Sequence, residues 1–369
     1  MTGAISMLAA FVVFILAHEA GHFFAAKALG IKVSEFFVGF GPRIWSIQKG
    51  ETEYGLKAIP AGGYVRIVGM SVLEEVDPED IGRTYREKPF WQKSVVVLSG
   101  IAANFAIAYL IFVGLFAVNG TIEIQPVVEE VRAEIDGSDQ IAPAALIGLQ
   151  PGDEFLSVAG EPTDSWSDVQ SAISTHPGEE VEIVIDRNGR ERTLTATLAS
   201  IDTGGSEPSG YLGVAPVIER VEVGFISAAG IAAGEVVEIT GEAYKTLWNV
   251  FRPSSLLQLI QGVFGEPVPD EIRPVSLIGI AQVGAQSDVL GVGTLIAFLA
   301  VFNIILGAFN VLPLLPLDGG HFAIALYERI THKQADIRKL IPIAATVILL
   351  MVFIGFVSIL LDIVQPIQF

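Results

Sequence analysis

Four long apolar segments constrain the fold of this chain more than any other feature of its sequence. They run from about Gly3 to Leu29, Val95 to Val118, Leu290 to Leu312 and Ile341 to Val364. Each is long enough to cross the roughly 30 Å hydrocarbon core of a bilayer as a helix. The first segment lacks a basic leading stretch and an Ala-x-Ala cleavage site, so we interpret it as a retained span. The sequence therefore predicts an α-helical membrane protein with four transmembrane helices.

The basic residues predict how these spans are oriented. Residues 27–93 hold ten Lys and Arg, and the short loop between the third and fourth spans adds Arg329, Lys333, Arg338 and Lys339. The positive-inside rule places both loops in the cytoplasm. Residues 119–289 then lie outside, with 8 Lys and Arg against 27 Asp and Glu, an excess equal to the chain's net charge of −19. We expect a multi-pass protein of the cell inner or plasma membrane, surrounded by lipid and without a nucleic-acid partner.

The outer region divides into two parts by its pattern. Residues 121–216 alternate strand-like runs with turn signals such as Asn188-Gly189, and one helical stretch lies between them. Residues 217–289 contain a helical segment with glutamates three and four positions apart on one face, namely Glu235, Glu238 and Glu242. This segment predicts an amphipathic helix, on the membrane surface or packed on the core. Residues 1–120 and 290–369 carry the two pairs of spans.

A metal-binding motif interrupts the first apolar segment at His18-Glu19-Ala20-Gly21-His22. On a helix the two histidines return to nearly the same face, so both imidazoles can reach one ion. Glu19 can take a proton from water activated by zinc. Charged groups at the centre of a span cost about 2.5–3.5 kcal/mol, which a metal site would compensate. The alternative is a polar helix face that solvates a channel or packs against partners.

A catalytic zinc needs a third protein ligand, and the chain contains no Cys. Asp318 is our candidate because it follows a proline-interrupted stretch at the end of the third span and precedes Gly319-Gly320. Prolines end a helix and let an acidic side chain turn inward. His321 is the rival ligand, although a position at a helix start or interface explains it more simply. His176 and His332 fall in turn and loop sequences that predict solvated side chains.

Several motifs together resemble those of the site-2 proteases, specifically the regulator-of-sigma-E-protease branch with an outer PDZ domain. The matching residues are His18 to His22, Phe37 to Pro42, Pro60 to Val65, Gly100 with Asn104, and Leu317 to His321. The likeness covers nearly the whole chain. It implies Zn2+ held by His18, His22 and Asp318, with Glu19 as the base.

The resemblance also implies where a substrate lies. Residues from about 33 to 68 would form a membrane-reentrant β-sheet, and Gly62, Gly63 and Tyr64 on it would hold an unwound substrate by strand addition. Asn310 matches a family asparagine that grips the substrate backbone, and Asn104 either helps similarly or bonds neighbouring helices. The chain departs from the family at Ile305, where relatives often carry another Asn. Asn303, two positions away, has no assigned role.

The outer module resembles a single PDZ domain of the bacterial protease type. The matching residues are Pro143 to Ala145 and Gly148 to Val158. Tyr211-Leu212-Gly213-Val214 resembles the carboxylate-binding loop of such domains, whose backbone amides receive a peptide terminus. Two roles remain open: the module either binds peptide termini or excludes bulky outer domains.

These observations predict an intramembrane zinc metalloprotease that cleaves the transmembrane segments of single-span membrane proteins. By resemblance the substrates include pre-trimmed anti-sigma factors and remnant signal peptides. The alternative is a non-catalytic membrane scaffold that binds partners through its PDZ domain, without zinc and indifferent to His22→Ala. A transporter with buried acids is a third possibility, which four spans and a large PDZ module disfavour. The sequence does not fix the physiological substrate, the cleavage site or the oligomeric state.

Overall fold

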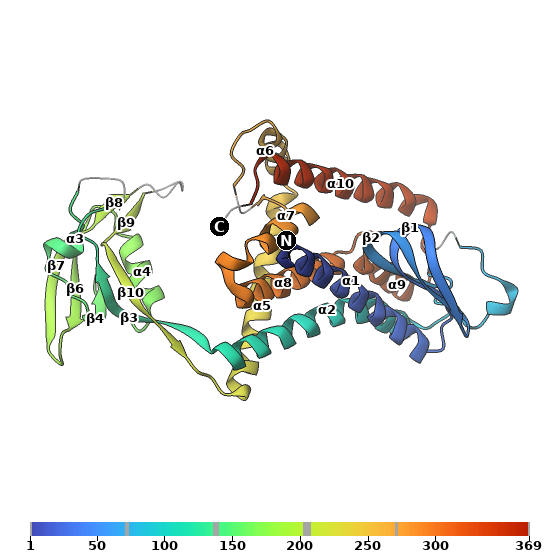
Figure 1. Ribbon diagram of the computed structural model, residues 1–369, viewed down its shortest axis with the longest axis horizontal. Coiled ribbons are helices and arrows are strands. Elements are labelled where there is room, and N and C mark those ends of the chain that lie inside the picture. The colour runs from blue at the N-terminus through green and yellow to red at the C-terminus, as the bar shows by residue number, and fades with distance from the viewer. Residues whose placement is uncertain (1, 71–73, 136–139, 202–207, 270–271, 368–369) are drawn as a thin grey trace. The chain divides into compact units, whose positions relative to one another are not determined.

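A computed structural model describes residues 2–70, 74–135, 140–201, 208–269 and 272–367 (Figure 1). The chain divides into two compact units. The first combines Met1–Val118 with Gly224–Phe369, and the second is Asn119–Val223. The N-terminal and C-terminal parts of the sequence therefore fold together as one unit, and the residues between them in the sequence form the other.

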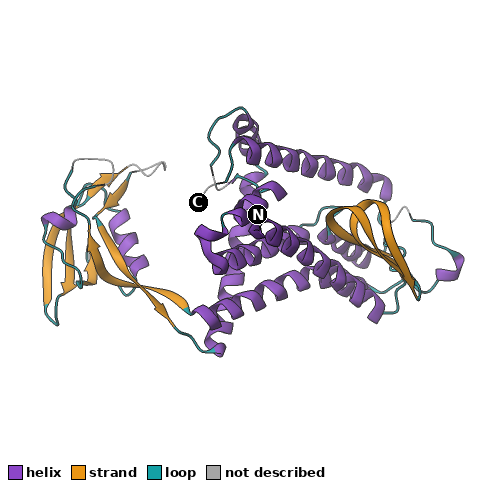
Figure 2. Ribbon diagram, viewed as in Figure 1, coloured by secondary structure: helices purple, strands orange, loops and turns teal. Residues whose placement is uncertain are grey.

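Four helices in the described residues are long and apolar enough to cross a membrane, by length and composition. They are α1 (Thr2–Ala28), α2 (Phe90–Asn119), α8 (Ser287–Val311) and α10 (Ile337–Val364) (Figure 2). All four predicted apolar segments lie on these helices. Helix α2 begins five residues before the predicted Val95, directly after Pro89. Helix α8 is interrupted at Gly291, whose backbone (φ 77°) is not helical, so its apolar stretch starts there.

A curved β-sheet lies in the same unit, between α1 and α2 in the sequence. It consists of two long antiparallel strands, β1 (Val33–Lys49) and β2 (Thr52–Ile67), joined by a tight turn. The strands bend so far that the first half of β1 is paired on both sides; Phe37, for example, pairs with both Gly55 and Tyr64. The last part of β2 therefore forms an outer edge of the sheet. A short 3-10 helix (Pro78–Asp80) follows before α2.

Shorter helices complete this unit: α5 (Phe225–Val250), α6 (Pro253–Val263), α7 (Leu277–Ala285) and α9 (Asp318–Thr331). Helix α5 is the predicted amphipathic helix, and it packs on the core. Its Ala232 is fully buried in one cluster with Ala108 of α2 and Ile304 of α8, while Glu238 and Glu242 are exposed. Small residues on α5 thus face the spans and its acids face away from them.

The second unit contains a six-stranded sheet, with five strands in the order β10-β3-β4-β6-β7 and β5 paired with β4. The bounds are β3 (Thr121–Val131), β4 (Glu154–Val158), β5 (Glu161–Pro162), β6 (Glu180–Asp186), β7 (Glu191–Thr197) and β10 (Val214–Val221). A separate pair, β8 (Ala199–Ile201) and β9 (Ser209–Tyr211), and the helices α3 (Pro143–Leu146) and α4 (Trp166–Ser174) accompany it. The alternating side chains of β4 and β6 bury Phe155, Ile183 and Ile185 against α4.

The expected boundary at residue 216 falls inside this sheet. Strand β10 continues to Val221 and pairs there with Thr121, at the start of β3. Residues 217–221, expected in the amphipathic segment, therefore belong to the second unit. Periodicity alone missed the continuation because only the pairing with a strand about a hundred residues earlier holds this segment in the sheet.

Candidate metal centre

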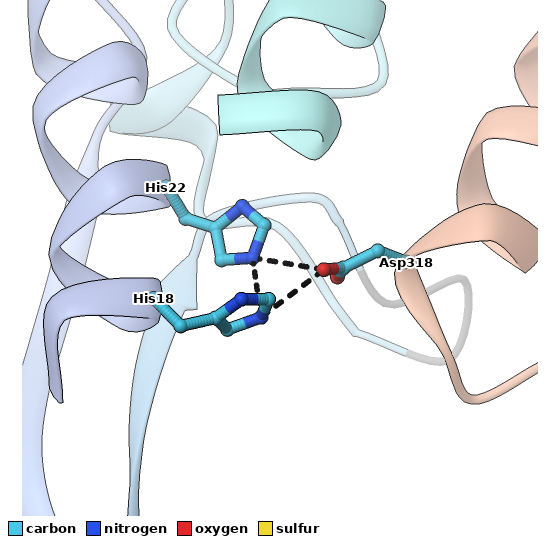
Figure 3. Close-up of side chains that lie close together, drawn as sticks. All are labelled: His18, His22 and Asp318. Atoms are coloured by element: carbon cyan, nitrogen blue, oxygen red, sulfur yellow. Dashed lines mark hydrogen bonds and ion pairs between the residues drawn. The ribbon is translucent and has the colours of Figure 1, made fainter. Parts of the chain in front are cut away.

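The two motif histidines lie one helical turn apart on α1 and point the same way (Figure 3). Both are buried, with 7% and 4% of their surface exposed for His18 and His22. Their Nε2 atoms are 3.2 Å apart. Asp318 completes the group, because its Oδ2 atom lies 3.1 Å from His18 Nε2 and 3.2 Å from His22 Nε2. The structure thus brings together the three residues expected to bind a metal.

The break between α8 and α9 places Asp318. Helix α8 ends at Val311, a proline-containing linker follows, and Asp318 is the first residue of α9. Gly319 and Gly320 let α9 start so close to the end of α8. A β-carbon on Gly319 would lie 2.1 Å from the carbonyl oxygen of Val311, and one on Gly320 would lie 2.6 Å from the Leu314 carbonyl carbon. The Asp-Gly-Gly sequence is therefore a requirement of packing at this site.

The three donor atoms fit a tetrahedral zinc ion. Donors about 2.0–2.2 Å from a tetrahedral centre are separated by about 3.3–3.6 Å, which is close to the three distances of 3.1–3.2 Å found here. No other group of three such ligands is found among the described side chains. Asp318 Oδ2 is also buried, with the two imidazole nitrogens as its polar neighbours. Two imidazoles and a carboxylate suit zinc chemically, and a three-ligand set leaves the fourth position open.

Contacts from α2 fix the orientation of His22. Its Nδ1 atom donates a hydrogen bond to the carbonyl oxygen of Val96 at 2.8 Å, which leaves Nε2 to bind a metal. The ring also lies directly against Gly100, where a β-carbon would stand 2.3 Å from Nε2. Gly21 of α1 likewise lets the two helices approach each other, because a β-carbon on Gly21 would lie 2.5 Å from the Ser99 carbonyl oxygen of α2. Gly21 and Gly100 therefore let α1 and α2 cross closely enough for the His22 ring to lie against α2.

Glu19 faces the edge of the β-sheet. Its Oε2 atom accepts a hydrogen bond of 3.0 Å from the backbone amide of Val65 in β2. Gly63 lies beside it, and a β-carbon there would be 3.0 Å from Leu16 Cδ2 and 3.7 Å from Glu19 Cγ. The Val65 contact could not be predicted, because a backbone amide carries no side-chain signature.

Tyr64 and Gly62 lie in the same edge segment. Gly62 has a φ of +145°, and a β-carbon there would be 2.9 Å from the Phe40 ring. Tyr64 stacks on Phe37 and donates a hydrogen bond to Glu35, while Lys57 donates one to its hydroxyl at 2.6 Å. Burial, and then the hydrogen bond to Glu35, raise the pKa of Tyr64 above its usual value.

The asparagines and the rival histidine lie outside the group of three. The Asn310 side chain donates to the Leu306 carbonyl oxygen within its own helix at 3.1 Å. Asn104 is completely buried, and its backbone carbonyl accepts a hydrogen bond of 2.8 Å from Asn303, which joins α2 to α8. His321 lies outside the group of three and lines a cavity of about 170 Å³ with Tyr85 and Glu328.

The predicted carboxylate-binding loop lies in the second unit. Residues Tyr211, Leu212, Gly213 and Val214 line a cleft of about 460 Å³ together with Trp166, Ser171 and other residues of α4. These four consecutive residues thus line one cleft between a helix and strands.

A family model described as Peptidase family M50 matches residues 6–355, which is most of the chain. The chain belongs to peptidase family M50. Among its relatives, the zinc metalloprotease Rip1 of Mycobacterium tuberculosis is 31% identical over 407 residues, covering 100% of this M50 chain and 98% of the relative. The zinc metalloprotease RasP of Shouchella clausii is 26% identical, with 92% and 93% covered.

A solved structure shows a partial likeness to this M50 protein. The PDZ domain of an SdrC-like protein from Listeria monocytogenes aligns with 26% of this chain and 87% of its own, at 21% identity and a TM-score of 0.21. The resemblance to site-2 proteases thus holds at the level of the family, and it covers both the spans and the metal-binding motif.

Proposed function

We propose that this M50 protein is a membrane-embedded zinc endopeptidase that hydrolyses peptide bonds within or beside the bilayer. The observation that carries the proposal is the meeting of His18, His22 and Asp318 inside a unit built from membrane-spanning helices. These three residues would hold the zinc. When bound, zinc would polarise the scissile carbonyl and make water acidic enough to lose a proton near neutral pH.

Glu19 serves as the general base. It neighbours the ligand His18 on α1 and its second carboxylate oxygen is held by the Val65 amide. We infer that the other oxygen takes a proton from the attacking water and later returns it to the nitrogen of the leaving amine. The Val65 contact restricts the rotamers of Glu19, so the base is oriented before substrate arrives.

The edge of β2 presents the substrate. A transmembrane helix hides its amides in internal hydrogen bonds, so it has to be unwound before it can be cut. We propose that Gly62, Gly63 and Tyr64 hold the unwound segment by adding it to the sheet as a strand. The absence of side chains on the two glycines lets that strand lie close to Glu19. Asn310 and Asn104 are the proposed polar contacts, Asn310 being the more accessible of the two.

We infer the membrane topology from the two loops that are rich in Lys and Arg. With residues 27–93 and 329–339 in the cytoplasm, the second unit would lie outside and the metal centre near the cytoplasmic side. Substrates would be transmembrane segments of single-span proteins, including pre-trimmed anti-sigma factors and remnant signal peptides by family resemblance. The sheet would then be membrane-reentrant, which agrees with exposed apolar residues on it such as Ile44 and Trp45.

The test is cleavage of a model span. The Glu19→Gln variant should lose cleavage of a co-purified single-span substrate by at least about 100-fold, because general-base catalysis contributes about that much or more. Its zinc content should remain near one per chain. Glu238→Gln, an exposed acid on α5, is the matched control and should cleave normally. Full activity of Glu19→Gln would refute the mechanism, and absence of zinc from the unaltered protein would favour the scaffold function.

A further inference from the structure

The cavity that His321 lines begins about one helical turn from the candidate metal centre. Asp318 is the first residue of α9, and His321 follows it by three positions, close to the 3.6 residues of one turn. One wall of the cavity is a single face of this helix, because its members are three and four positions apart. They are His321, Ile324, Ala325 and Glu328. The cavity is therefore tied to the proposed zinc ligand by one continuous helix.

Another wall of the cavity is the turn that ends the outer edge of β2. Gly69 and Met70 line it. The Ile67 carbonyl accepts a hydrogen bond of 3.1 Å from the Met70 amide, and Gly69 has a φ of +77°, so the chain turns away from the sheet here. A substrate strand on this edge would leave the sheet at Ile67, about 7 Å beyond Val65. Since the Val65 amide contacts Glu19, the cavity lies about two to five substrate residues from the bond to be cut.

The charged groups of the cavity leave an excess of positive charge. Of the lining residues that the structure describes, Arg86 and Lys93 are basic and Glu328 is acidic. Both oxygens of Glu328 are already in use. Its Oε2 atom lies 3.2 Å from Lys93 Nζ, and its Oε1 atom accepts a hydrogen bond of 3.4 Å from the Ala335 amide. With His321 counted as neutral, one positive charge remains, which favours an anion.

The Tyr85 side chain supplies an unused donor to the same cavity. Tyr85 is only 6% exposed and lines the cavity, and its hydroxyl has no hydrogen-bond partner among the described residues. Buried polar groups normally have one. The Tyr85 amide donates to the Val68 carbonyl at 2.9 Å, and Lys93 Nζ lies 5.9 Å from the ring centroid, so both ends of the residue are held. The hydroxyl can donate to a group that enters the cavity.

We propose that this cavity is a specificity site that receives an acidic side chain of the substrate, about two to five residues from the scissile bond. Its volume is about 170 Å³. At about 30 Å³ for each water-sized group, that is room for about five heavy atoms, as in one Glu side chain. Tyr85 donates to the carboxylate, and Arg86 with Lys93 supplies the positive charge. This role rests on the proposed proteolytic function and adds a substrate feature to it.

The experiment compares Glu with Gln in the substrate. The full-length protein with zinc, in detergent micelles, cleaves single-span model substrates in which one Glu is moved through six positions on each side of the scissile bond. Each substrate has a Gln twin, and mass spectrometry checks that both are cut at the same bond. We expect the ratio of kcat/KM for Glu over Gln to reach about 10 or more at one position, the range for hydrogen bonds to a charged group. Elsewhere it should stay within about 2-fold of one.

Two variants test which residues cause the preference. Tyr85→Phe removes the hydroxyl and keeps the ring, so the ratio should fall about 3- to 10-fold. Tyr54→Phe, in β2 and outside the described lining, is its control and should keep the ratio. Arg86→Glu should lower the ratio below one, because like charges then meet in the cavity. Lys88→Glu, two residues along the same loop, is the matched charge reversal outside the described lining and should keep the ratio within about 2-fold.

The outcomes separate this role from proteolysis itself. Each ratio is taken within one variant, so a partial loss of folded protein cancels. Cleavage of every substrate with ratios near one at all positions would overturn the specificity site and leave the protease intact. A preference for Glu that survives both Tyr85→Phe and Arg86→Glu would also overturn it. Failure of the unaltered protein to cleave any substrate would refute the proteolytic function, and the specificity site with it.

Discussion

The imidazole of His22 lies against the backbone of Gly100, with no room for a side chain between α1 and α2. The hydrogen bond from His22 to Val96, one turn earlier on α2, holds the ring in that place. The proposed metal centre is therefore built on three elements: α1 and α9 supply the candidate ligands, and α2 supplies the surface that orients one of them.

Gly100→Ala should remove metal binding and activity together. The new β-carbon would stand 2.3 Å from His22 Nε2, so the ring has to move. Loss of outer contacts to a metal ligand typically costs about 10- to 100-fold in metal affinity or activity, and we expect at least that. Zinc content by atomic spectroscopy and cleavage of a model span are the measurements. Gly114→Ala on the same helix, with no atom within 4 Å of its β-carbon, should leave both unchanged.

Gly63→Ala should separate catalysis from metal binding. Its β-carbon would press on Leu16 and come within 3.7 Å of Glu19, but it would not contact the three ligands. We expect kcat/KM to fall by about 10-fold or more, because small misplacements of a reacting group are costly, with zinc content unchanged. Gly230→Ala on α5, where the β-carbon meets no atom within 4 Å, is the control. An unaltered kcat/KM for Gly63→Ala would argue against substrate lying at this edge.

Zinc binding should depend on Asp318 and not on His321. Asp318→Asn and His22→Ala each remove a donor of the group, so zinc content should fall well below one per chain. His321→Ala should keep its zinc, because His321 lies outside the group. Chelation should abolish cleavage by the unaltered protein, and added zinc should restore it. Loss of zinc from His321→Ala would show that the ligand set is wrong.

Asp153→Asn should destabilise the second unit. Asp153 is completely buried, pairs with Arg187 through both carboxylate oxygens at 2.6 Å, and accepts a hydrogen bond from the Gln150 amide. Removing one partner of a buried pair costs about 3–5 kcal/mol. The loss in free energy of unfolding can be measured by urea unfolding, followed by the fluorescence of Trp166 in α4. Glu182→Gln, an exposed acid on β6, should change the free energy of unfolding by less than about 0.5 kcal/mol.

Much of the fold and the centre of the site could be predicted because their signals are local. Apolar length marks the spans, the spacing of His18 and His22 marks one helical face, and the prolines before Asp318 mark the break that turns it inward. The close approach at Gly100 and the Val65 contact could not be predicted, because they depend on how distant elements pack. Asn104 illustrates the same limit: its complete burial depends on how α2 packs against its neighbours, which the sequence does not reveal.

The proposed metal ligands come from the two ends of the sequence, about 300 residues apart. Ribosomes finish the first ligands long before the last one, so a partly made chain has the histidines and the base but cannot yet hold zinc in a three-residue site. Such a chain should be harmless to the proteins around it in the membrane. The order of synthesis thus delays assembly of the proposed three-residue site until the third span and the start of α9 have emerged.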